Sequence, residues 1–194
     1  MARDRAARPA ATPLRLFVAV ELSEEAGRAI DRAIAPWRAA FPRARWVPSE
    51  NRHVTLRFLG RTWPRLRGWV EDRVREAARG SAAFSVRLAG LGAFPSERRA
   101  RVLWVGLDDA DERLAALAAL LEVGLADAFP AERRPFTPHV TVARSDPPLA
   151  LPEEYRGSTV EPVEVRVEEI VLFRSHLARP APRYEALARF PLGG

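Results

Sequence analysis

The sequence predicts a mixed fold in which β-strands and α-helices take turns, forming one compact domain or two closely packed lobes. Two observations favour it. Segments of alternating polarity are separated by segments with helical spacing along almost the whole chain. The tetrapeptide pattern His–apolar–Thr–apolar also occurs once in each half, as HVTL and HVTV. At 194 residues the chain is long enough for one domain with an ample core.

In the first half of the chain, the sequence pattern predicts three strands and two helices. Ser23 followed by two glutamates marks a helix start, and Pro36 should end or bend that helix. Gly80 is placed to cap the second helix. In order, we expect a strand over 14–22, a helix over 23–37, strands over 45–47 and 53–59, and a helix over 64–79.

The second half predicts one long helix and a larger share of strands. The helix has leucines at helical spacing, which indicates a buried stripe. These leucines are Leu114, Leu117, Leu120, Leu121 and Leu125. The expected elements are strands over 83–88 and 101–107, a helix over 111–127, and strands over 139–143, 164–173 and 183–190, with loops over 90–97, 129–138 and 145–152.

Composition narrows the function classes. We expect residues 1–13 to be a disordered extension and 14–194 a single bilobal domain. No signal peptide or membrane-spanning run is recognisable, which favours the cytoplasm. Nothing in the sequence demands more than a monomer. The absence of cysteine excludes disulfides, thiolate nucleophiles and cysteine-bound metal. The net charge of +6 suits an anionic partner, although all 31 basic residues are arginine, which also fits a compositional bias with a solvated surface.

The two HxTx motifs predict a pair of matching catalytic strands. Side chains two apart on a strand point to the same face, so His53 lies beside Thr55, and His139 beside Thr141. Two imidazoles near neutral pH can supply a general base and a general acid. The hydroxyls can donate to phosphate oxygens, where charge builds in the transition state. This pattern suits opening of a cyclic phosphodiester without metal or cofactor.

The two motifs, together with further segments, resemble a known family. It is the RNA 2′,3′-cyclic phosphodiesterase branch of the 2H phosphoesterase superfamily, also called the 2′-5′ RNA ligase-like family. The similar segments are RLFVAV (15–20), RWVPSENRHVTLRFLG (45–60), LGAFPSERRARVLWVGL (91–107), RPFTPHVTVAR (134–144), LFRSHL (172–177) and RYEALARFPL (183–192).

The resemblance implies an α+β fold of two pseudo-symmetric lobes, whose antiparallel sheets flank a central groove with helices outside. It implies that His53 is the proton donor, that His139 is the proton acceptor, and that Thr55 and Thr141 hold the phosphate. The substrate would be RNA or an oligonucleotide with a 2′,3′-cyclic phosphate end, and the product a 2′-phosphomonoester. Relatives are also credited with the reverse 2′-5′ joining reaction. The residues alone leave the two histidines interchangeable.

Four further residues are candidates for substrate binding. Arg57 continues the alternation of His53 and Thr55, so it is expected on the same face of the strand as these two residues. Relatives often have Lys at this position, which has a different donor geometry. Arg144 is five residues after His139, so strict alternation places it on the opposite face of the strand. Arg134 lies in the link before the second motif. Phe17 is a candidate for base stacking.

Two other function classes were weighed. A zinc hydrolase would need three or four ligands at metal spacing, whereas this chain has three histidines, no cysteine and no HExxH motif. A non-catalytic RNA-binding module suits the basic charge, but it has no need for a repeated His–x–Thr pattern.

Overall fold

The computed structural model describes residues 12–179 and 181–193, so most of the expected disordered extension lies outside the described residues. The strands are β1 Leu14–Glu21, β2 Arg45–Trp46, β3 His53–Thr62, β4 Phe84–Phe94, β5 Ala100–Asp108, β6 His139–Leu149, β7 Glu164–Val167, β8 Glu169–His176 and β9 Arg183–Pro191. The helices are α1 Glu24–Ala40, α2 Arg67–Arg79, α3 Arg113–Leu125 and α4 Glu153–Arg156, with 3₁₀ turns η1 Ser49–Asn51, η2 Pro64–Leu66 and η3 Glu97–Arg99.

The strands form one curled antiparallel sheet with a symmetric order, β7-β4-β5-β6-β3-β1-β8-β9, and β2 pairs with β6. We call β3, β1, β8 and β9 the β1 lobe, and β6, β5, β4 and β7 the β5 lobe. The lobes meet at one pair of residues, Val54 with Val140. The predicted α+β fold with two related lobes is confirmed, and the two expected sheets are halves of a continuous one.

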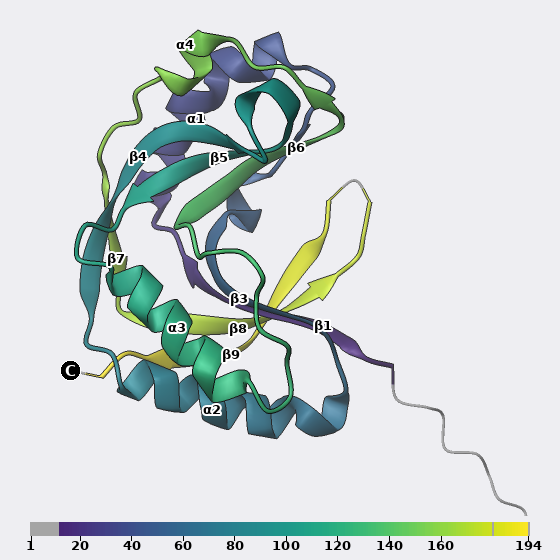
Figure 1. The fold of residues 1–194 in the computed structure, drawn as a ribbon, viewed down its shortest axis with the longest axis vertical. Helices are drawn as coiled ribbons and strands as arrows, with labels where there is room; N and C mark the ends of the chain where they lie inside the picture. The colour runs from purple at the N-terminus through teal and green to yellow at the C-terminus, as the bar shows by residue number, and fades with distance from the viewer. Residues whose placement is uncertain (1–11, 180, 194) are drawn as a thin grey trace, which may run out of the picture.

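Helices cover the outside of both lobes. Figure 1 shows α2 and α3 against the β1 lobe, and α1 with α4 against the β5 lobe. The Trp37 indole of α1 packs edge-on to Tyr155 of α4, at 5.1 Å between ring centres, and donates to Ser158. Thus α1, which follows β1 in the chain, packs on the opposite lobe. None of the helices among the described residues is long and apolar enough to cross a membrane.

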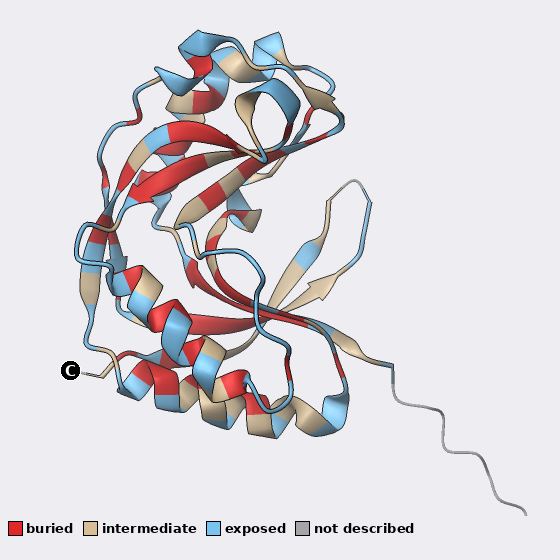
Figure 2. Cartoon of the chain, in the orientation of Figure 1, coloured by how far each residue is buried: buried red, intermediate tan, exposed pale blue. Residues whose placement is uncertain are grey.

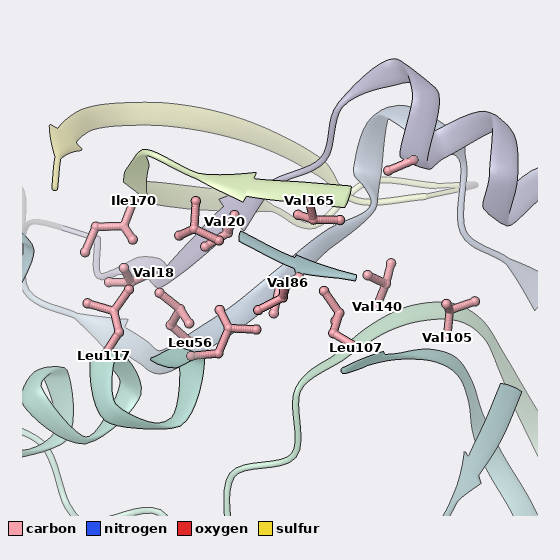
Figure 3. Packing of buried hydrophobic residues seen from close by; sticks show 14 of the residues in the cluster. Val18, Val20, Leu56, Val86, Val105, Leu107, Leu117, Val140, Val165 and Ile170 are labelled. Atoms are coloured by element: carbon pink, nitrogen blue, oxygen red, sulfur yellow. The ribbon is translucent and has the colours of Figure 1, made fainter. Parts of the chain in front are cut away.

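The core is continuous through the seam between the lobes (Figures 2 and 3). On α3 the leucine stripe is buried as predicted, except that Leu120 is exposed. In the close view, Leu117 of α3 lies near Val18 and Leu56 of the β1 lobe, while Val140 lies near Leu107 of the β5 lobe. Burial of these side chains fixes which face of each strand is left for the groove.

A β-bulge lies at the last residue of each HxTx motif and reverses the face of the residues after it. On β3, Ala19 pairs with Thr55 but Val18 pairs with Arg57, so Leu56 is the extra residue. Arg57 therefore points outward, where it is 3% exposed and lies 3.0 Å from carboxylate oxygens of both Glu122 and Glu132. The prediction that Arg57 shares the face of His53 is wrong, because strict alternation does not survive a bulge.

The bulge on β6 has the opposite consequence for Arg144. Leu103 pairs with Ala143 and Trp104 with Thr141, which leaves Val142 as the extra residue. Arg144 is exposed and returns to the face of His139 and Thr141. Arg144, which strict alternation places on the face opposite to His139, thus lies on the groove face.

Several element boundaries also differ from the prediction, and the expected strand over 164–173 is two strands, β7 and β8, in different lobes. α1 continues past Pro36 to Ala40. β4 extends through the expected loop to Phe94, because Gly92 has no side chain and the Trp104 ring fills the space where a Cβ would lie, only 2.2 Å away. β6 continues through two prolines to Leu149, pairing there with Ala100.

Replacement of Arg57 by methionine should destabilise the protein. The change leaves Glu122 without its buried partner and removes the guanidinium donor to the Pro130 carbonyl. Because both glutamates are partly exposed, we expect a loss of about 1–3 kcal/mol, below the range for a fully buried pair. Urea unfolding measures this loss, and Arg61→Met on an exposed position of the same strand is the control. Equal stability of the two variants would contradict the ion-pair role.

Candidate active site

The seam between the lobes brings the two motifs together. Because β3 and β6 run antiparallel through the Val54–Val140 pair, the neighbours of each valine face the groove on either side of that pair. His53 and Thr55 enter from the β1 lobe, and His139 and Thr141 from the β5 lobe, and all four side chains are partly buried. The structure thus brings together the four residues that the motifs predict.

Each imidazole is held by the carbonyl two residues before it. Nδ1 of His53 is 2.9 Å from the Asn51 oxygen, and Nδ1 of His139 is 2.7 Å from the Thr137 oxygen. A carbonyl only accepts, so each Nδ1 carries a proton and donates it. In the neutral ring Nε2 is then the nitrogen with the free lone pair. Both rings therefore have the same tautomer and can exchange a proton at Nε2.

Burial makes both imidazoles hard to protonate. The pKa of His53 is lowered to about 4, chiefly by burial; the Asn51 carbonyl opposes this shift, His139 and Arg144 add to it, and Glu21 opposes it. Burial also lowers the pKa of His139, with a smaller effect from Arg144. The pKa values of both histidines therefore lie below the ordinary imidazole value of 6.5. Both rings are neutral at pH 7, and an anion between them would favour protonation.

Aromatic rings form the wall around His53. Its ring stacks on Phe17 at 4.8 Å between centres and meets Tyr184 edge-on at 5.3 Å. Phe17 is only 1% exposed beneath His53, Phe173 and Tyr184, so the prediction that it stacks on a nucleobase is wrong. It instead supports the imidazole. Phe58, 49% exposed and tilted against Phe17, is the accessible ring on this lobe.

A second aromatic wall surrounds His139. Phe94 meets the imidazole edge-on at 5.1 Å, and the centre of the Trp104 ring is 6.3 Å from it. Trp104 lies flat over Gly92, where any side chain would collide with the indole. The sequence analysis places Trp104 on a predicted strand and Phe94 in a predicted loop. That both rings meet at His139 depends on how the strands pair, which no local sequence pattern specifies.

The two remaining predicted residues, Arg144 and Arg134, differ in their position relative to the histidines. Burial lowers the pKa of both histidines and raises that of Tyr184, and the positive charge of Arg144 acts on all three groups, adding to the first shift and opposing the second. Arg134 is exposed in the link before β6, and its predicted substrate contact remains a prediction.

Two residues just before His53 support its ring, and sequence reasoning missed both. Arg52 is buried and donates to the Val47 and Gly27 carbonyls and to Asp31, which fixes η1 against α1. The Asn51 side chain donates to the Pro182 carbonyl at 2.8 Å. The run of polar residues before the motif was the available signal, but it does not identify these long-range partners.

The lowered pKa of His53 predicts a pH-dependent stability. An unfolded chain takes up this proton near pH 6.5, whereas the folded ring takes it up near pH 4. Between these values the unfolded state binds more protons, so stability falls as the pH falls through this window, by up to about 3 kcal/mol. Thermal unfolding from pH 7 to pH 4 should show a weaker dependence for His53→Gln. The same slope in both proteins would contradict the buried neutral ring.

Comparisons with known proteins agree with this geometry. The sequence pattern of the 2′-5′ RNA ligase superfamily matches residues 26–179. An RNA 2′,3′-cyclic phosphodiesterase of Geobacillus stearothermophilus is 35% identical over 181 residues, and the match covers 92% of this chain and 57% of that protein. This chain therefore spans little more than half the length of that relative.

Two other similar proteins match over nearly their full length. An RNA 2′,3′-cyclic phosphodiesterase of Thermus thermophilus is 35% identical, covering 93% of this chain and 91% of the relative. The structure of Escherichia coli LigT complexed with 3′-AMP superposes with a TM-score of 0.76 at 28% identity, covering 93% of this chain and 98% of LigT. On its motifs, its fold and these matches, the chain belongs to the 2′-5′ RNA ligase superfamily.

Proposed function

We propose that this protein hydrolyses the 2′,3′-cyclic phosphodiester at an RNA end to a 2′-phosphomonoester. The observation that carries the proposal is the matched pair of imidazoles, each with Nδ1 bound to a carbonyl and Nε2 available, on strands that meet at one residue pair. The names of the similar proteins from Geobacillus and Thermus support the choice of substrate. Cytoplasmic location and a monomeric state remain predictions.

In the proposed reaction, His139 accepts a proton from water through Nε2 as the water oxygen attacks phosphorus. The bond from phosphorus to the ribose 3′ oxygen breaks, and His53 donates the proton on its Nε2 to that oxygen. The substrate phosphate carries a negative charge, and this charge raises the pKa of His53 on binding and loads the ring with its proton. Proton donation thus depends on the substrate being bound.

The groups around the phosphate would stabilise the transition state. Thr55 and Thr141 lie beside the histidines on the groove face, where their hydroxyls can donate to the non-bridging oxygens. Arg144 supplies a positive charge near both imidazoles. A guanidinium presents several donors in a fixed plane, which suits two oxygens of one phosphate. Together these groups balance the extra charge of a five-coordinate phosphorus.

Loss of either imidazole should abolish most of the turnover. We expect His53→Ala and His139→Ala each to reduce kcat on a nucleoside 2′,3′-cyclic phosphate by at least about 100-fold, since each removes one proton-transfer group. RNA binding should be largely kept. His176→Ala is the control, because His176 pairs with Glu185 at the far end of β8.

The alternative of an RNA-binding module without catalysis makes the opposite prediction. It requires no cyclic-phosphate hydrolysis by the wild-type protein, or equal rates in the wild type and both variants. Hydrolysis that stops when EDTA removes divalent metal would instead favour a metal-dependent enzyme.

A further inference from the structure

The groove face of the β1 lobe carries two arginines at directly paired positions of neighbouring strands. Arg15 of β1 pairs with Arg61 of β3, and both side chains are exposed. Because Leu16 is buried in the core, Arg15 and Phe17 on either side of it face the groove. Arg61 shares this face, since paired residues of antiparallel strands point the same way. We call Arg15 and Arg61 the arginine pair.

The charges of the arginine pair are not neutralised by the described part of the chain. Neither guanidinium forms a salt bridge there, whereas Arg57 on the opposite face of β3 lies 3.0 Å from carboxylate oxygens of two glutamates. Like charges directly opposite each other destabilise a sheet. The pair therefore does not serve the stability of the fold, and an anion bound between the two guanidinium groups would relieve their repulsion.

The arginine pair lies a strand segment away from the reacting phosphate. Ala19 pairs with Thr55, and Arg15 comes four residues before Ala19, a separation of about 13 Å along β1. In Figure 1 this end of β1 projects to the right, away from the seam between the lobes. The two places share one positive field, because burial raises the pKa of Tyr184 and the charges of Arg144 and Arg15 both oppose this shift. This spacing suits a second phosphate of the same substrate.

An exposed aromatic ring beside the pair favours a nucleic acid strand over a small anion. Trp63 directly follows β3 and is 45% exposed. Thr62 is buried, so its neighbours Arg61 and Trp63 both face away from the core. Basic groups that follow a phosphate backbone, next to rings on which bases stack, are the usual features of sites for single strands.

We propose that the arginine pair binds a backbone phosphate of the RNA strand on the 5′ side of the cyclic end. The proposal rests on the proposed function, which places the cyclic phosphate between the imidazoles. The rest of a longer substrate continues through the 5′ oxygen of the terminal ribose and must leave along a face of the groove. A guanidinium fork matches two phosphate oxygens, and the pair supplies two such forks at one point.

Two matched substrates test the proposal. Both are adenosine trinucleotides that end in a 2′,3′-cyclic phosphate and carry 2′-O-methyl groups on the upstream riboses. One has charged internal phosphodiesters, and the other has uncharged methylphosphonates in their place. We expect the wild-type kcat/KM to be about tenfold higher for the charged substrate, as one charge-assisted contact contributes about that much. This preference should fall as salt is added, because salt competes for the phosphate contacts.

Arg61→Glu should remove the preference and leave kcat/KM for the uncharged substrate close to the wild-type value. Its thermal midpoint should not fall, since a glutamate opposite Arg15 replaces a repulsive pair by an attractive one. Arg156→Glu is the control, because it changes the net charge equally on α4, at an exposed position outside the β5 lobe. This control should keep the preference.

Equal wild-type kcat/KM for the two trinucleotides, or an equal drop for both in Arg61→Glu, would overturn the phosphate-binding role. Loss of the preference in Arg156→Glu as well would assign it to the net charge and would also overturn that role. Hydrolysis of the uncharged trinucleotide would still support the proposed function, whereas turnover of neither substrate would overturn both proposals.

Discussion

The site depends on two backbone hydrogen bonds, from Nδ1 of His53 to the Asn51 oxygen and from Nδ1 of His139 to the Thr137 oxygen. Each bond fixes the tautomer of a ring and directs its Nε2 away from the main chain. The carbonyl lies two residues before the ring in both cases, so the same local geometry occurs twice. The fold then brings the two rings together by pairing β3 with β6 at Val54 and Val140.

The symmetric scaffold has chemically different walls, and this difference separates two similar histidines. His53 stacks on Phe17 and adjoins an open cavity, whereas Trp104 and Phe94 surround His139. Burial lowers the pKa of both rings. In the proposed reaction, a neutral His139 accepts a proton from water, while His53 needs the negative charge of the substrate to hold the proton that it donates. One local structure can therefore supply both an acid and a base.

Much of the fold and the four central residues could be predicted, because the motif and strand periodicity are local signals. The side on which Arg57 and Arg144 lie could not, since each follows a bulge that is defined by pairing with a distant strand. The supporting role of Phe17 depends on rings from β3, β8 and β9 that cover it. The extension of β4 likewise depends on Trp104, which a sequence pattern around Gly92 does not reveal.

The central claim is that both imidazoles keep the Nδ1–H tautomer and direct Nε2 to one phosphate. Nitrogen-15 NMR of the histidine side chains, recorded at pH 7 with and without inorganic phosphate, tests it most directly. The account predicts the Nδ1–H form for His53 and His139 in the free protein, and a change at Nε2 of both rings when phosphate binds. A proton on Nε2 of either free ring, or a response of only one ring to phosphate, would contradict it.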